Sequence, residues 1–189
     1  MKLFRSSLIG LVAVSALLVS TAGLAKNPSN KVTIVDVASA VNEETGEFST
    51  LLFAAGLYPD IVAYLQANGQ RTLFAPTDEA FGKLNAILPM FCYNDVLDLA
   101  GQQPAYVGEV LAYHVAKGRL DASEVLPKDQ IRMLTGDFVT RVPQTTVITD
   151  ALGRDATLEI LNVFAGNGVI HGISEVILPY APPTGTSCP

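Results

Sequence analysis

Two histidines, His114 and His171, are the side chains of this sequence best suited to bind a metal or to transfer a proton near neutral pH. At helical spacing, His114 shares an apolar face with Val110 and Leu111, which favours a buried, hydrogen-bonded side chain. His171 alternates along a strand with apolar neighbours such as Ile173, which again favours the core. We therefore expect both histidines to have a structural role, and a binding role for His114 stays open beside it.

The other residues that could do chemistry form no recognised catalytic or metal-binding pattern. The sequence has neither Cys-x-x-Cys nor His-x-x-x-His spacing for zinc, and its scattered acids form no calcium loop. Ser174 is only a strand neighbour of His171, without a Gly-x-Ser-x-Gly turn. Asp78 and Glu79 are explained by a helix start, where negative side chains are favoured. The sequence thus predicts no enzyme, no metal and no cofactor.

The N-terminus has the three parts of a cleavable secretory signal. Lys2 and Arg5 give a positive start, residues 8–19 are mostly apolar, and the small residues of STAGLA, residues 20–25, suit cleavage. The apolar run is shorter than the roughly 20 residues that span a bilayer. We predict a signal peptide at residues 1–25, with Ala22 as an alternative cleavage site. The mature protein is expected in the periplasm or outside the cell, without membrane insertion.

The chain carries an acidic excess. It has 18 acidic and 12 basic residues and a net charge of −6, which becomes −8 when Lys2 and Arg5 leave with the signal. An acidic chain without a basic run opposes nonspecific binding to nucleic acid or anionic lipid, because both attract clustered Lys and Arg. Nucleic acid is therefore not an expected partner.

Cys92 and Cys188 form an even pair in a chain that is predicted to reach an oxidising compartment, which favours a disulfide. The bond would close a loop of about 95 residues and stabilise the fold by up to roughly 4–5 kcal/mol. Two free thiols, or pairing between molecules, stay open as alternatives because sequence does not give the distance between the two Cα atoms.

Helical signals fill the first half of the chain and strand signals the second. Prolines, caps and apolar spacing predict helices over residues 49–56, 59–67, 77–88 and 104–117, with Ser49 and Thr77 as N-caps and Gly118 as the last C-cap. Strands are predicted over residues 71–75, 138–142, 145–149, 156–164 and 169–178, with a hairpin turn at 166–168. This order indicates an α+β domain with a mainly antiparallel sheet.

Three segments resemble the fasciclin-like (FAS1) domain family. TLFAPTDEAFGKL, residues 72–84, is similar to the first signature segment of the family, and NGVIHGISEVILP, residues 167–179, is similar to the second. Between them, VLAYHVAKGRL, residues 110–120, is similar to the central segment with the Tyr-His pair of the family. Their order fits one complete copy, which we place at residues 26–181, followed by a short Pro-rich tail at residues 182–189.

The resemblance implies the FAS1 fold, a wedge-shaped β-sandwich with helices packed against it, and adhesion without catalysis. It also implies binding candidates: Tyr113 and His114 from the Tyr-His region, and Asp60 and Ile61, because an Asp-Ile pair is associated with integrin binding in the family. Asp60 is equally explained as a residue of a helix start. Tyr113 does not share the helix face of His114, so we expect its hydroxyl at an edge. GISE, residues 172–175, departs from the family, which more often has an apolar residue and an Asp there.

These observations favour an exported fasciclin-like protein of cell adhesion or extracellular matrix, which binds an extracellular protein or polysaccharide. The short leader looks bacterial, and single-domain bacterial members of the family are commonly linked to surface attachment or biofilm matrix. The alternative hypothesis is a periplasmic or extracellular carrier of a small apolar or sugar ligand, held in a pocket between helices and sheet.

Overall fold

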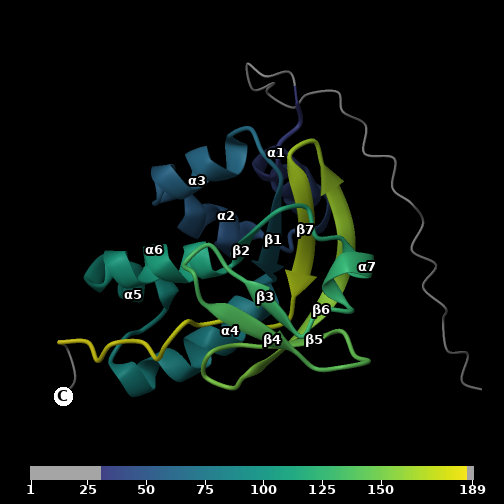
Figure 1. Cartoon of the computed structure of the whole chain (residues 1–189). Helices are drawn as coiled ribbons and strands as arrows, with labels where there is room; N and C mark the ends of the chain where they lie inside the picture. The colour runs from purple at the N-terminus through teal and green to yellow at the C-terminus, as the bar shows by residue number, and fades with distance from the viewer. Residues whose placement is uncertain (1–30, 187–189) are drawn as a thin grey trace, which may run out of the picture.

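The computed structural model describes residues 31–186 (Figure 1). The predicted signal peptide and Cys188 lie outside these residues. The helices are α1 (Ile34–Thr45), α2 (Ser49–Gly56), α3 (Pro59–Gln66), α4 (Asp78–Ile87), the 3-10 helix η1 (Leu88–Phe91), α5 (Val96–Gln102), α6 (Pro104–Tyr113) and α7 (Ala122–Val125). The strands are β1 (Arg71–Pro76), β2 (Val115–Lys117), β3 (Gln130–Arg132), β4 (Phe138–Arg141), β5 (Val147–Thr149), β6 (Asp155–Ala165) and β7 (Gly168–Ile173).

The seven strands form one mixed sheet in the order β2-β1-β7-β6-β5-β4-β3. β1 and β7 run parallel, and every other neighbouring pair is antiparallel. β6 and β7 are joined by the hairpin turn that the glycines at 166 and 168 predict. The α+β class and the mainly antiparallel sheet are therefore confirmed.

The sheet bends until its two edge strands meet. The long strand β6 pairs with β5 through its first residues and with β7 through the rest, and its register shifts between Leu158 and Val163. At the other side, Ala116 of β2 forms a bridge with Met133, which follows β3. The Leu134 N–H also donates to the Val115 carbonyl at 2.6 Å. The result is a barrel-like sandwich rather than an open sheet.

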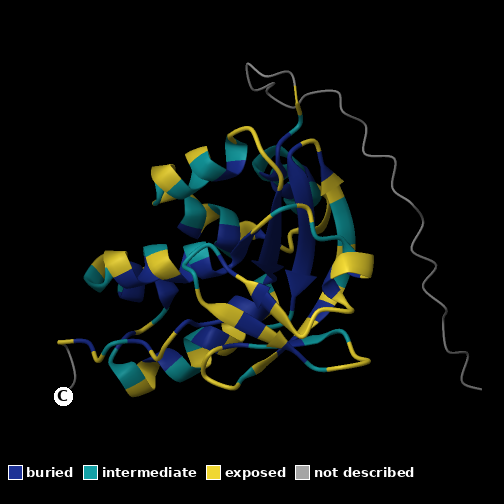
Figure 2. Ribbon diagram, in the orientation of Figure 1, coloured by how far each residue is buried: buried dark blue, intermediate teal, exposed yellow. Residues whose placement is uncertain are grey.

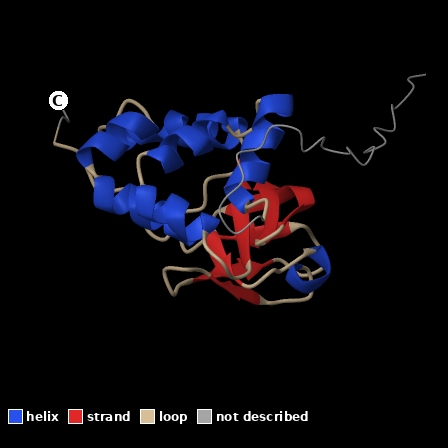
Figure 3. Cartoon of the chain, turned by 90° about the horizontal axis from the view of Figure 1, so that it is seen from above, coloured by secondary structure: helices blue, strands red, loops and turns tan. Residues whose placement is uncertain are grey.

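Successive residues of β1 face two separate apolar cores, because side chains alternate across a strand. Leu73 and Ala75 pack with the helices, while Phe74 points into the closed sheet beside Ile173. Helices α1 to α6 gather against one side of the strands, and the short α7 lies apart from them (Figure 3). Figure 2 shows β1 and β7 buried between the layers.

Local sequence explains the start and the inner face of α4. The Thr77 hydroxyl accepts a hydrogen bond from the Ala80 N–H at 3.3 Å, as its predicted N-cap role requires. Phe81, Leu84 and Leu88, which share one helical face, are all buried. Among the described residues, no helix has the length and the apolar character needed to cross a bilayer.

Three of the predicted boundaries are wrong. Ser49 is the first residue of α2 rather than its cap; the N-cap is Phe48, whose N–H donates to the side chain of Asn42 at 2.9 Å. Gly118 does not end α6, because the helix stops at Tyr113 and β2 intervenes. The last strand ends at Ile173 rather than at residue 178, since the backbone of residues 176–178 bonds to side chains described below.

Candidate functional site around the Tyr-His pair

The adjacent side chains of Tyr113 and His114 enter different cores at the end of α6. Tyr113 points into the closed sheet and packs with Phe74 and Ile173. His114 lies on the helical side, next to Val110 and Leu111, as its helical spacing predicts. The pair therefore joins the two layers of the domain at one point of the backbone.

The His114 ring is buried and both of its nitrogens are engaged by backbone groups. Nδ1 lies 2.7 Å from the Val110 carbonyl and donates to it, while Nε2 accepts from the Ile177 N–H at 3.2 Å. The two partners fix the neutral Nδ1–H tautomer, because a carbonyl needs a donor and an N–H needs an acceptor. Burial is the main reason that the pKa of His114 falls to about 4. The prediction of a buried, hydrogen-bonded histidine is confirmed.

The Tyr113 side chain is fully buried, so the prediction of a hydroxyl at an edge is wrong. Its hydroxyl donates to the Phe138 carbonyl at 2.8 Å and so ties the end of α6 to β4. Burial raises the pKa of Tyr113 to about 12, which keeps the phenol neutral. The prediction that Tyr113 and His114 lie on different faces of the helix is confirmed, but the face of Tyr113 meets the second core rather than solvent.

An ion pair between the buried Asp150 and the half-buried Arg154 holds the segment that His114 contacts. Asp150 Oδ2 accepts from Arg154 Nη2 at 2.7 Å and from the Leu178 N–H at 3.0 Å. The same Arg154 atom donates to the Val176 carbonyl at 2.8 Å. Together with the bond from Ile177 to His114, three successive residues are fixed by side chains from other parts of the chain. No local pattern in the sequence predicts this role of Asp150, since its partners at 176–178 are remote in sequence.

His171 has an equivalent structural role inside the closed sheet. Nε2 lies 2.8 Å from the Leu120 carbonyl, Nδ1 accepts from the Asn162 N–H at 3.4 Å, and the ring stacks on Phe74 at 5.7 Å between centroids. Burial is the main cause that lowers the pKa of His171. The predicted core position is confirmed.

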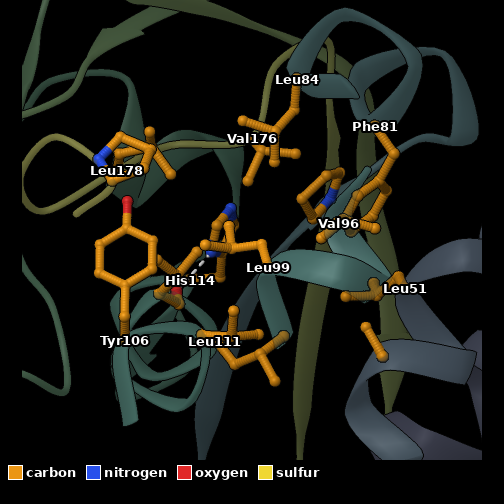
Figure 4. Close-up of a pocket in the computed structure, with 15 residues that line it drawn as sticks. Leu51, Phe81, Leu84, Val96, Leu99, Tyr106, Leu111, His114, Val176 and Leu178 are labelled. Atoms are coloured by element: carbon orange, nitrogen blue, oxygen red, sulfur yellow. Dashed lines mark hydrogen bonds between the residues drawn. The ribbon is translucent and has the colours of Figure 1, made fainter. Parts of the chain in front are cut away.

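The space on one side of His114 is almost completely filled. Figure 4 shows the ring among apolar side chains that include Leu99, Leu111 and Val176. The gap between them measures about 20 Å³, which is room for about one water molecule. This side of the histidine is part of the packed core and offers no room for a ligand.

A larger pocket lies on the other side of His114, between the helices and the sheet. It measures about 240 Å³ and is walled by α1, α2, α3 and β1. His114 and Ile61 both line it, whereas Asp60 is exposed on α3 outside it. Of the four predicted binding residues, the structure thus brings two to one pocket and leaves Tyr113 and Asp60 elsewhere. The remaining lining is apolar apart from Ser39.

Asn167 fixes the walls of this pocket, and sequence reasoning identified it only as a turn residue. Its Oδ1 accepts from the Ile34 N–H at 2.8 Å, and its Nδ2 donates to the carbonyls of Leu65 at 2.6 Å and Ala67 at 3.2 Å. One buried amide therefore holds the start of α1 and the end of α3. The Asn-Gly turn signal in the sequence was correct, but it does not reveal these distant partners.

The C-terminal tail passes beside Cys92. The Gly185 N–H donates to the Phe91 carbonyl at 2.8 Å, and a Cβ at Gly185 would lie 3.0 Å from the Cys92 carbonyl oxygen. Cys188 follows three residues later, outside the described residues, so its pairing with Cys92 stays a prediction. Within residues 31–186, no three His, Cys, Asp or Glu side chains gather as metal ligands would.

Comparison with known families identifies the class of protein that these features define. The family model "Fasciclin domain" matches residues 43–179, which include α2 to α7, all seven strands and the Tyr-His pair. The chain belongs to the fasciclin domain family, and its fold is the FAS1 fold. The resemblance of the three sequence segments is thereby confirmed.

Individual relatives extend this result. "Protein sll1483" of Synechocystis sp. is 38% identical over 148 residues, which cover 78% of this chain and 73% of the relative. "Uncharacterized protein sll1735" of the same organism is 34% identical over 143 residues, 75% of this chain and 96% of the relative. "Transforming growth factor-beta-induced protein ig-h3" of Sus scrofa is 29% identical over 149 residues, but these are only 20% of that protein.

Among solved structures, a FAS1 domain pair from the insect cell adhesion molecule fasciclin I is similar with a TM-score of 0.48 and 22% sequence identity. The match covers 63% of this chain and 40% of that one.

Proposed function

We propose that this protein is an exported fasciclin-like protein that acts in cell adhesion or extracellular matrix. It binds an extracellular protein or polysaccharide through its surface and has no catalytic activity. Membership of the fasciclin domain family over residues 43–179 is the observation that carries this proposal. The similarity to Transforming growth factor-beta-induced protein ig-h3 of Sus scrofa adds to the case only through the segment that the two chains share.

The geometry of the Tyr-His pair supports a binding surface elsewhere than at these two side chains. His114 and Tyr113 are buried, and their polar atoms are hydrogen-bonded to backbone groups within the domain. These buried side chains make the domain a rigid support for a surface contact, and an adhesive contact needs no catalytic group because it acts by equilibrium binding. Asp60, which is exposed on α3, stays available as a contact residue.

Deletion of the gene in the source organism tests the adhesive role. Weaker attachment of cells to a surface or to matrix polymer is expected, with recovery when purified protein is added back. Attachment that is unchanged by deletion contradicts the proposal.

The pocket beside His114 favours carriage of a small apolar ligand as the second candidate function. Its volume of about 240 Å³ is below the usual range of roughly 300–1,000 Å³ for drug-sized ligands, so the occupant would be small. A sugar needs several polar partners, and the lining offers only Ser39 and the already engaged His114. These contacts favour an apolar ligand over a sugar.

Native mass spectrometry of the purified protein tests the carrier. A bound small molecule is expected, and Ala55→Leu should remove it by filling the pocket, because Ala55 lines the wall. Ala63→Leu on the exposed face of α3 is the matched control and should leave the ligand in place. A protein that carries no ligand after extraction from its own organism contradicts this second function.

A further inference from the structure

A surface groove of about 360 Å³ runs along the junction where β2 and β3 meet. β2 and β3 lie next to one another in Figure 1, at the two ends of the strand order. The residues that line the groove come from β2, from β3 and from the segments around them: Lys117, Leu120, Lys128, Gln130, Ile131, Arg132, Met133, Leu134 and Gly136.

Three cations line this groove and no carboxylate does. Lys117, Lys128 and Arg132 are exposed, and within the described residues none of them forms an ion pair. By contrast, Lys83 pairs with two glutamates and Arg154 pairs with Asp150. The groove therefore carries unbalanced positive charge on a protein whose net charge is −6.

The hydrogen bond that Arg132 makes in the groove leaves its positive charge available to a ligand. Arg132 Nε donates to the Gly136 carbonyl at 3.3 Å, which orients the guanidinium without neutralising it. Concave surfaces with one sign of charge concentrate the field and raise the local concentration of ligands with the opposite sign. An anionic group would relieve the mutual repulsion of the three cations, so the groove is complementary to an anion-rich partner.

We propose that the groove between β2 and β3 binds an acidic polysaccharide through its carboxylate or sulfate groups. This inference rests on the proposed adhesive function and names the chemical class of its partner. Lys117, Lys128 and Arg132 contact the anionic groups. The half-buried Leu120 and Leu134 beside them present apolar surface on which the C–H faces of pyranose rings pack.

Two features favour a polysaccharide over the other polyanions that a basic groove could accept. An extended peptide gains affinity from main-chain hydrogen bonds when it adds a strand to a free sheet edge, but here the Ala116–Met133 bridge already joins the two edges. The flat surface of an anionic membrane fits a concave site poorly, because its headgroups lie in one plane. A flexible chain of charged sugars can follow a groove, and it needs neither a free sheet edge nor a flat protein surface.

Binding of the purified full-length chain to polygalacturonate, a polymer of carboxylated sugars, tests this site. Measurement at about 50 mM and about 500 mM salt should show strong binding only at the lower value, because the Debye length falls from roughly 14 to 4 Å. Neutral dextran is expected not to bind. Polyglutamate, a peptide of similar charge density, is expected to bind more weakly than polygalacturonate.

Charge-neutralising variants assign the binding to the groove. The triple variant Lys117→Gln, Lys128→Gln and Arg132→Gln should bind polygalacturonate about tenfold or more weakly, since each exposed charge contact contributes a fraction of a kcal/mol to about 1 kcal/mol. Each single variant should lose less. Lys83→Gln removes one positive charge outside the groove and should bind as the parent does. All four positions are exposed, so melting temperatures should be unchanged.

Three results overturn the inference: equal binding of the parent to neutral dextran and polygalacturonate, tighter binding of polyglutamate, or unchanged binding by the triple variant. Failure of the adhesive role is a separate outcome. If the triple variant loses polygalacturonate binding while gene deletion leaves attachment intact, the groove is supported and the adhesive function is contradicted. If deletion weakens attachment but the triple variant restores it fully, adhesion stands and the groove is not its site.

Discussion

The Nε2 atom of His114 accepts a hydrogen bond from the backbone N–H of Ile177 at 3.2 Å, although the two residues are 63 positions apart in the chain. This bond anchors the segment that follows the last strand to the end of α6. The bond gives the buried imidazole of His114 a structural role in the core of the domain. The consequences for stability can be measured.

Replacement of His114 by Ala should destabilise the fold by about 1–3 kcal/mol, because it leaves the Ile177 N–H buried without its acceptor. Thermal or denaturant unfolding measures the change. Lys31→Ala, at an exposed position, is the control and should shift the melting temperature little. An unchanged melting temperature together with lost binding would show that His114 is a ligand contact rather than a structural residue.

Stability should fall as the pH is lowered from about 6.5 to about 4. The pKa of His114 in the folded state is about 4, below its ordinary value of 6.5, so the unfolded chain binds the extra proton first. This depressed pKa contributes stability that is fully present above pH 6.5 and amounts to roughly 3 kcal/mol. His171, whose pKa is also lowered by burial, contributes in the same direction.

Unfolding measured in denaturant across this pH range tests the linkage. The parent protein should lose stability progressively, and His114→Gln should flatten the profile while it lowers stability at neutral pH. A profile of the same steepness in both proteins would assign the pH dependence to other groups.

Replacement of Asp150 by Ala should lower the free energy of unfolding by about 2–3 kcal/mol, because it leaves the buried Leu178 N–H without its acceptor and the half-buried Arg154 without its carboxylate. Denaturant unfolding again gives the change in free energy. The control is Asp129→Ala, the same substitution at an exposed aspartate, which should leave the free energy of unfolding nearly unchanged. Equal effects of the two substitutions would contradict the role given to the buried carboxylate.

The predicted disulfide can be tested by peptide mapping without reduction. A linked peptide that contains Cys92 and Cys188 is expected, because the tail at Gly185 already lies beside Cys92. Reduction should lower stability by up to roughly 4–5 kcal/mol if the chain-entropy model holds. Disulfide-linked dimers on a non-reducing gel, or two thiols that react with a thiol reagent in the native protein, would contradict the intramolecular bond.

The sequence predicts the residues that point inward better than it predicts their partners. The burial of His114 follows from helical spacing and that of His171 from strand alternation, because both are local periodicities. Tyr113 was correctly assigned to another face of α6, but only the fold shows that this face meets a second core. A local pattern carries no information about which distant element covers a face.

The basic groove illustrates the same limit for surfaces. Lys117, Lys128 and Arg132 do not form a run in the sequence, and a search for clustered basic residues passes over them. Closure of the sheet brings β2 and β3 together and so gathers the three cations. The short strands β2 and β3 were themselves missed, because three residues are too few to establish an alternating pattern.

The parallel pairing of β1 with β7 joins residues about a hundred positions apart, such as Leu73 and Ile170. Loop-closure entropy must be overcome before such distant contacts stabilise the chain, so pairings of this kind form slowly. β1 cannot pair with β7 until residues 168–173 have left the ribosome, long after β1 itself has been synthesised. The buried centre of the sheet is therefore among the last parts of the native structure that can form during synthesis.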